Sequence, residues 1–396
     1  MRIATSTFQN DAVSQMDALE ASLAQTQQQL STGLKVQNAA DDPVGATTAN
    51  QLTVEISAST QYVTNSNSAQ TNLQLEEQAL TSASNIMQNA NTLAVEANQS
   101  SLTSAQRQNI ATELQQDLNQ LVSIGNTTAS DGSYLFGGVA SGSAPFAQSN
   151  NNVTYNGSTQ VNQIQISENQ SISAGDSGAT AFMTVPTGNG TFVTSAAAAN
   201  TGSASISTGE VTQPNQWVPG NYTVSFTDPT DYTITDNSSG ATVASGTYSD
   251  GNTISFNGAQ FTISGTPATG DTFSIAPAGT TSAFSALSNL ITTLNSTSLN
   301  NGQLGTQIGS AIQQINNTIT NFSNVSASVG SRLNAITAAQ STAGTNQTTM
   351  KTNISTITNV DYAAATTALS SEELALQAAQ ESYASLEKMS LFQYLQ

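Results

Sequence analysis

The spacing of apolar and polar residues divides the chain into three segments. In residues 1 to about 130, and again from about 282 to the end, apolar residues recur every three or four positions, which predicts helices with one apolar face. Between about 150 and 280, apolar and polar residues alternate, and Gly, Pro, Tyr and Phe become more frequent, as is typical of strands and turns. The simplest architecture has the two helical ends packed on each other, with a strand-rich domain inserted between them.

The first helical segment carries a heptad seam. Its core positions are separated by 3, 4, 3 and 4 residues, the pattern of a coiled coil, with the polar Thr26 as a break. Gly33 is a predicted helix stop. Further helices are expected from Pro43 to about Ser100 and from Ser104 onwards. The apolar residues of this N-terminal seam, including its extension by one turn, are Met16, Leu19, Leu23, Leu30 and Leu34.

The residues Asp41, Asp42 and Pro43 have two interpretations. Two carboxylates beside a turn could bind a metal ion. The alternative, which we favour, is a helix start, because Pro is tolerated in the first turn and carboxylates are stabilised at the positive end of the helix dipole. We therefore expect no metal site here, and no cofactor elsewhere in the chain.

The last helix is predicted to carry a second, longer seam. From Tyr362 to Leu386 its positions alternate strictly between steps of 3 and 4, with Glu372 as the only charge. A lone seam on a terminal helix cannot bury itself, so it needs the N-terminal helix, a neighbouring subunit, or both. The residues predicted to make this contact are Leu369, Leu376, Ala379, Tyr383 and Leu386, followed by Leu391 and Phe392.

The middle segment predicts short strands separated by turns. Tyr222–Asp228 and Tyr232–Asp236 alternate Tyr, Val, Phe and Ile with polar residues. A weaker upstream group includes a strand at Phe182–Val185. Short strands at this spacing favour a small antiparallel sandwich or barrel. The other predicted strands are Val153–Tyr155, Val161–Ile166, Ala241–Thr247, Ile254–Phe256, Gln260–Ser264 and Asp271–Ala276.

The composition excludes several classes of chemistry. The 396 residues include no Cys and no His, which removes His-based triads, thiol nucleophiles and His-ligated zinc. Six Lys and Arg against 25 Asp and Glu give a net charge of −19, so no nucleic-acid-binding surface is expected. No apolar run is long enough for membrane insertion. We therefore expect the protein not to be an enzyme.

Two pairs of adjacent carboxylates could suggest catalysis. Glu76-Glu77 and Glu372-Glu373 each bring two acidic residues together in the sequence, as a glycosidase would need in space. Neighbouring residues on a helix point to different sides, so we expect solvated helix faces instead.

The strand-rich segment contains two further candidates. Asp250 and Asp271 lie beside Gly residues and could bind Ca²⁺, but ordinary turn chemistry is the favoured interpretation. Trp217 could stack on a ligand, but packing at the edge of the β domain is favoured.

Several motifs, in order along the chain, resemble one family. LSTGLKVQNAADDPVGA at 30–46 resembles the N-terminal segment of bacterial flagellins, and LTSAQRQNIATELQQDLNQLVSIGN at 102–126 with DGSYLFGG at 131–138 is similar to their helical core. The end of the chain resembles the family's C-terminal helix. The closing MSLFQYL at 389–395, together with DDP at 41–43 and GDSGATAFM at 175–183, is closest to the hook–filament junction branch of the family. The resemblance covers roughly the first 150 and the last 110 residues.

The resemblance implies a mainly α fold with an inserted β domain, in which both chain ends form a flagellin-like helical bundle and coiled coil. It implies three domains: terminal assembly segments 1–40 with 362–396, a helical core of 41–150 with 282–361, and an inserted β-rich domain of 151–281.

The resemblance also implies a structural role. The subunit would leave the cytoplasm unfolded through the type III export apparatus of the flagellum, with an export chaperone on its C-terminal helix. It would then assemble with copies of itself as a ring at the extracellular hook–filament junction, between hook-associated protein type 1 and flagellin.

Two alternatives remain open at this stage. One is a filament flagellin, against which the terminal sequences argue. The other is an extracellular adhesin or glycan-binding module in the β domain, which could coexist with a junction role. A carboxylate-based enzyme is the weakest alternative, because no convergent catalytic motif is present.

Overall fold

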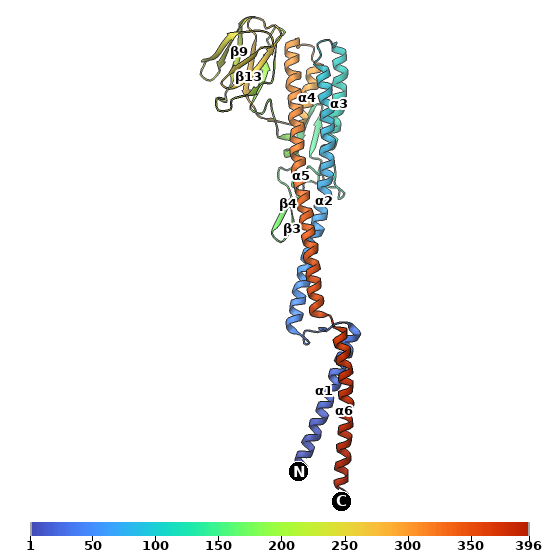
Figure 1. Ribbon diagram of the computed structural model, residues 1–396. Coiled ribbons are helices and arrows are strands. Elements are labelled where there is room, and N and C mark those ends of the chain that lie inside the picture. Colours follow the sequence, from blue (N-terminus) through green and yellow to red (C-terminus); the bar gives the residue numbers. More distant parts are fainter. Residues whose placement is uncertain (1, 395–396) are drawn as a thin grey trace. The chain divides into compact units, whose positions relative to one another are not determined.

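The computed structural model describes the backbone of residues 2–394 and the side chains of residues 6–385 (Figure 1). The chain divides into two compact units, residues 1–63 with 339–396 and residues 64–338. The first unit thus takes in both predicted terminal segments and part of the predicted helical core. The second unit combines the rest of that core with the inserted domain. The division into three domains stays a prediction.

The first unit contains two terminal helices and parts of two long ones. They are α1 (Arg2–Thr32), the beginning of α2 (Pro43–Ala97), the end of α5 (Asn301–Thr358) and α6 (Tyr362–Tyr394). α1 and α6 lie side by side (Figure 1) and pack on each other. This is the pairing of the two chain ends that the matching heptad patterns predict.

The second unit has a helical part formed by the remainder of α2 and α5 with α3 (Ser104–Gly125) and α4 (Ala283–Asn295). α3 begins where the sequence predicts, because Thr103 and Gln106 form a reciprocal capping box. α3 and α4 pack closely on each other. Their apolar faces form a core with α2 and α5 that includes Leu73, Leu80, Met87, Leu114, Leu118, Leu121, Leu287, Leu290, Ile308 and Ile315.

The second unit also contains three two-stranded sheets outside the inserted domain. β1 (Phe146–Ser149) pairs with β2 (Asn152–Tyr155), β3 (Gln163–Ser167) with β4 (Gln170–Ser173), and β5 (Val185–Pro186) with β15 (Thr280–Thr281). A 3₁₀ turn, η1, spans Gly138–Ala140.

The predicted strand at Phe182–Val185 is wrong in its first half. Residues Ala179–Met183 form a short π-helical turn, and only Val185 lies in a strand. The turn directs Phe182 into a buried cluster of aromatic rings, a tertiary contact that outweighs the local β propensity of this segment.

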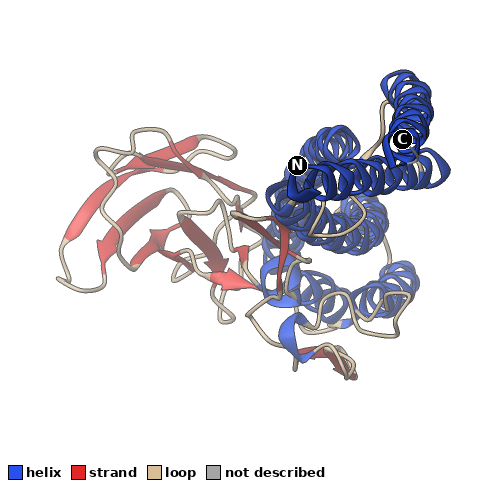
Figure 2. Ribbon diagram, turned by 90° about the horizontal axis from the view of Figure 1, so that it is seen from below, coloured by secondary structure: helices blue, strands red, loops and turns tan. Residues whose placement is uncertain are grey.

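The inserted domain consists of two antiparallel sheets (Figure 2). One has the strand order β11-β10-β9-β14-β6, and the other has β12-β13-β7 with β8 beside β13. The strands are β6 (Phe192–Ala196), β7 (Ser205–Ile206), β8 (Glu210–Val211), β9 (Tyr222–Asp228), β10 (Asp231–Asp236), β11 (Thr242–Thr247), β12 (Thr253–Phe256), β13 (Ala259–Ser264) and β14 (Thr272–Pro277).

The two sheets share one core. Alternate residues of β9, Tyr222, Val224 and Phe226, are buried and meet apolar residues of the other sheet such as Phe261 and Ile263. The period of two in the sequence therefore places one face of each sheet inward, as a sandwich requires.

Candidate assembly surface of the paired terminal helices

The N-terminal seam is only partly covered by its own chain. Met16, Leu19, Leu23 and Leu30 are half-buried, and Leu34 is 38% exposed. The most covered seam position in the described part of α1 is Thr26, the predicted polar break, with 8% exposure.

The C-terminal seam shows the same partial burial. The half-buried residues of this seam are Leu369, Leu376, Ala379 and Tyr383. Ala365, one turn before them, is buried. The remaining predicted contact residues, Leu386, Leu391 and Phe392, lie outside the residues whose side chains the structure describes.

In the described part of the seam, a polar contact joins the two helices. Ser22 Oγ in α1 donates a hydrogen bond of 2.6 Å to Glu372 Oε1 in α6. Glu372 Oε2 is buried and has no hydrogen-bond partner among the described residues. Glu373 is exposed, as expected for a solvated face, whereas Glu372 belongs to the helix contact.

Backbone hydrogen bonds join the segment that follows α1 to the segment that precedes α6. Leu34 and Asn359 form an isolated β-bridge, the Lys35 N–H donates to Thr358 O at 2.7 Å, and the Val360 N–H donates to Gly33 O at 3.0 Å. Gly33 has a φ of +74°, which only Gly adopts without strain. A Cβ at this position would lie 2.9 Å from the Tyr362 Oη.

Replacement of Gly33 by Ala is therefore expected to destabilise the α1–α6 pair by about 1–3 kcal/mol. The measurement is the rate at which a protease of broad specificity cleaves α1 and α6 in the monomer. Gly132→Ala is the control, since Gly132 also has a positive φ but open space around a Cβ. Unchanged cleavage in the Gly33 variant would show that this turn does not hold the helices.

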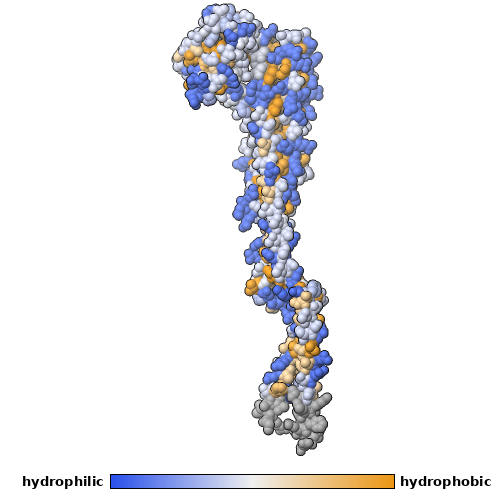
Figure 3. All heavy atoms as spheres, viewed as in Figure 1, coloured by the Kyte–Doolittle hydropathy of each residue, from blue (hydrophilic) through white to orange (hydrophobic). Residues whose placement is uncertain are grey.

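Apolar side chains remain exposed on the first unit. They include Phe8 at 56% exposure, Val44 at 75% and Leu374 at 69%, and apolar surface is visible along the described part of the terminal helices (Figure 3). Half-covered seams beside exposed apolar residues are typical of helices that pack against further chains.

The Asp-Asp-Pro motif forms a helix start. α2 begins at Pro43, and Asp42 Oδ1 accepts the Gly45 N–H at 2.9 Å, which is N-cap geometry. Asp41 Oδ2 accepts the N–H groups of Gln37 and Asn38 at 3.0 and 2.9 Å, and these bonds lower the pKa of Asp41. Among the described residues, no cluster of three or more acidic side chains could hold a metal ion.

Turn chemistry accounts for the acidic residues of the β domain. Asp271 is 2% exposed, and its carboxylate accepts backbone N–H groups of Thr201, Gly202 and Ala268 at 2.9, 3.1 and 2.8 Å. Asp250 Oδ1 accepts the Gly265 N–H at 2.7 Å. Both oxygens of Asp271 are thus engaged by loop backbone, and Asp250 supports its turn through one oxygen.

Trp217 packs against the β core, as predicted. Its ring lies 5.2 Å from that of Phe192 and 6.1 Å from that of Phe256, measured between centroids. Its Nε1 is buried and has no partner among the described residues.

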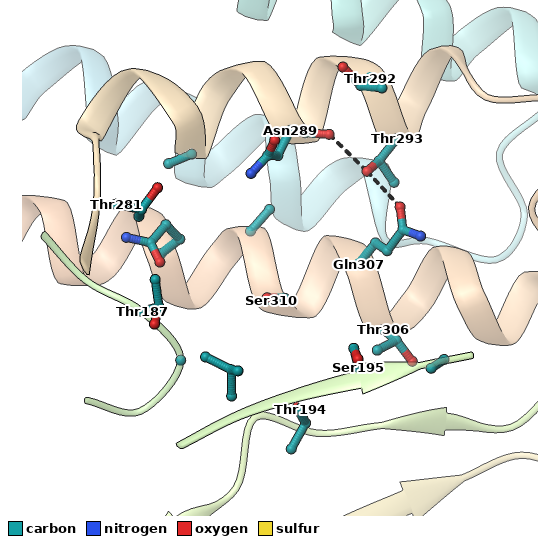
Figure 4. Close-up of a pocket in the computed structure, with 16 residues that line it drawn as sticks. Thr187, Thr194, Ser195, Thr281, Asn289, Thr292, Thr293, Thr306, Gln307 and Ser310 are labelled. Atoms are coloured by element: carbon teal, nitrogen blue, oxygen red, sulfur yellow. Dashed lines mark hydrogen bonds between the residues drawn. The ribbon is translucent and has the colours of Figure 1, made fainter. Parts of the chain in front are cut away.

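A cavity of about 430 Å³ lies between β6, α4 and α5 (Figure 4). At its wall, Thr293 Oγ1 hydrogen-bonds Asn289 O of its own helix at 2.8 Å and Gln307 Oε1 of α5 at 2.9 Å. The lining consists of hydroxyl, amide and small apolar side chains and includes no titratable residue. Such a lining can hydrogen-bond a neutral group but supplies no acid–base pair and no charged metal ligand.

The described helices include none that is both long and apolar enough to cross a membrane.

Comparison with known families identifies the helical ends. Residues 3–141 match the model of the bacterial flagellin N-terminal helical region, and residues 312–395 match that of the bacterial flagellin C-terminal helical region. Residues 195–277 match the D2-like domain of flagellar hook-associated protein 1.

Solved structures cover a larger share of the chain. The crystal structure of FlgL from Xanthomonas campestris (space group H3) is 34% identical, with a TM-score of 0.69, over 75% of this chain and 99% of that one. Flagellar hook-associated protein 3 from Legionella pneumophila is 28% identical, with a TM-score of 0.73, over 78% and 98%. The chain therefore belongs to the bacterial flagellin family. Within that family it belongs to the branch of FlgL, the flagellar hook-associated protein 3.

Curated relatives agree on this branch over shorter stretches. Flagellar hook-associated protein 3 of Salmonella typhimurium is 29% identical over 47% of this chain and 58% of its own length, and that of Escherichia coli is 31% identical over 38% and 47%. The match thus spans about half the length of these relatives. The phase 1 flagellin of Salmonella naestved matches over only 28% of this chain and 22% of its own length. Filament flagellins are therefore the more distant relatives.

Proposed function

We propose that this protein is a structural subunit of the bacterial flagellum that joins the hook to the flagellin filament. The observation that carries the proposal is the similarity to FlgL of Xanthomonas campestris, which extends over 99% of that chain. The paired terminal helices support it, because their seams are only half covered and can pack against further subunits.

The proposed partners follow from this position in the flagellum. Copies of this chain would form a ring between hook-associated protein type 1 and flagellin. Residues 195–277 resemble a domain of flagellar hook-associated protein 1, so the two proteins would share this domain type. Before assembly, the C-terminal helix would bind an export chaperone, and the unfolded chain would pass through the type III export apparatus to the outside of the cell.

We also propose that the role is mechanical and not enzymatic. The chain has no His and no Cys, and the cavity between β6, α4 and α5 lacks titratable groups. The work of the protein would consist of geometry and packing, with the seams supplying the contacts. The proposed role requires neither nucleic-acid binding nor membrane insertion.

Immunogold labelling of isolated flagella tests the proposal. Antibodies against the inserted β domain should label one point per flagellum, where the hook meets the filament. Labelling along the whole filament would identify a flagellin instead. Absence of label from flagella, with label elsewhere on the cell surface, would support an adhesive role.

A further inference from the structure

Two acidic side chains are buried in the helical part of the second unit, Glu76 of α2 and Asp117 of α3, and Glu76 is the more deeply buried. Glu76 of α2 is 2% exposed, so the expected solvated face is wrong at this position. The loop around Asp176 covers it, and the Asp176 N–H donates to the two carboxylate oxygens of Glu76 at 3.1 and 3.3 Å. The sequence pattern of α2 alone could not reveal this burial, because the covering loop lies 100 residues away.

The same loop is fastened to α5 on its other side. The Asp176 carboxylate forms an ion pair with the guanidinium of Arg332 in α5, the only ion pair among the described residues. Arg332 Nη1 also donates to Ser173 O at 3.4 Å. Three elements, α2, the loop and α5, therefore meet at two carboxylates and one guanidinium.

The fastened loop leads directly into the aromatic cluster. The Gly178 N–H donates to Phe136 O at 2.8 Å, and Ser177 is 1% exposed. Five residues after Ser177, the π-helical turn places Phe182 among the buried rings. Movement of residues 173–178 would therefore disturb the anchoring of Phe182.

Burial and the neighbouring carboxylate of Asp176 oppose the ionisation of Glu76. Burial, and next the neighbouring Asp176, raise the pKa of Glu76 to about 8, while Arg332 opposes that rise. Glu76, Asp176 and Tyr134 line a small cavity of about 70 Å³, and Glu77 follows Glu76 on α2. When Glu76 is protonated, one carboxylate faces one guanidinium, whereas ionisation leaves two negative groups for a single positive one.

We propose that Glu76, Asp176 and Arg332 form a pH-sensitive latch that fastens residues 173–183 between α2 and α5. Protonation of Glu76 closes the latch, and ionisation weakens it. This device lies outside the terminal seams, so it goes beyond the proposed junction role and does not depend on it.

The sign of the effect follows from proton binding. The pKa of Glu76 rises from 4.5, its ordinary value, to about 8 in the folded protein, so the folded state holds the proton more tightly. The stability contributed by the latch is complete below about pH 4.5 and is lost as the pH rises through about 8.

Thermal unfolding of the full chain between pH 5.5 and 9 tests the latch. The midpoint of the native protein should fall by roughly 5 °C over this range, and Glu76→Gln should remove most of that fall. Glu96→Gln, at an exposed position of the same helix, is the matched control and should behave like the native protein. Equal pH dependence in Glu76→Gln and the native protein would overturn the proposal.

Amide hydrogen exchange shows which residues lose protection when the latch weakens. Amides of residues 173–183, corrected for the intrinsic pH dependence of exchange, should lose about tenfold in protection between pH 6 and 9 in the native protein and not in Glu76→Gln. Unchanged protection there would overturn the latch even if the midpoint shifts.

Two further measurements keep the test decisive if Glu76→Gln does not fold. Carbon-13 NMR should show the native Glu76 carboxyl titrating far above the ordinary range, and titration near 4.5 would refute the proposal. In Asp176→Asn, the loss of the like charge should move this titration to lower pH. An unmoved titration would show that Asp176 does not act on Glu76.

Discussion

Replacement of Phe182 by Ala is expected to lower the free energy of unfolding of the second unit by about 3–5 kcal/mol. The Phe182 ring is fully buried and lies 5.0 Å from that of Phe136, 5.3 Å from Phe146, 5.5 Å from Phe284 and 5.2 Å from Phe322, measured between centroids. Its removal leaves a cavity that the loop, strand and helices around it cannot all close. Urea unfolding, followed by the signal of this unit, measures the loss.

Phe8→Ala is the matched control for this variant. Phe8 is the same residue type at 56% exposure in α1, and its truncation should change stability by no more than about 0.5 kcal/mol. A loss below about 1 kcal/mol for Phe182→Ala would mean that the aromatic cluster does not hold the second unit together.

Leu376→Asp is expected to abolish filament formation on hooks. Leu376 lies half-buried in the contact of α6 with α1, and a carboxylate there must either lose its hydration or force the helices apart. In an assembled ring the same cost recurs in every subunit, so a modest penalty per chain becomes a large one. The measurement is swimming in cells whose own copy of the gene carries the substitution, with electron microscopy of their hooks.

Leu374→Asp provides the comparison on the same helix. Leu374 is 69% exposed, so this substitution should leave the α1–α6 pair of the monomer intact. Any defect that it causes would then come from contacts between subunits. Normal filaments in Leu376→Asp cells would contradict the proposed assembly role of the seam.

The periodicity of the sequence predicted the elements whose burial pattern is local. α1, α2, α3 and α6 carry apolar residues at helical spacing, and the strands β9, β12, β13 and β14 alternate between buried and more exposed residues, so their types follow from spacing alone. The pairing of the terminal helices was also predictable, because each seam lacks another surface on its own helix.

The remaining features depend on contacts between distant residues. The π-helical turn at Phe182 differs from the predicted strand because it is defined by the aromatic cluster that it completes. The burial of Glu76 likewise needs a loop from another part of the chain. β7 and β8 have two residues each, which is too short for an alternating pattern to predict them.

Electron microscopy of cells lacking this gene, with an immunoblot for flagellin in the medium, tests the central claim most directly. The junction role predicts hooks without filaments together with free flagellin outside the cells, because export continues while the filament has nothing to grow on. Intact, working filaments in these cells would contradict it.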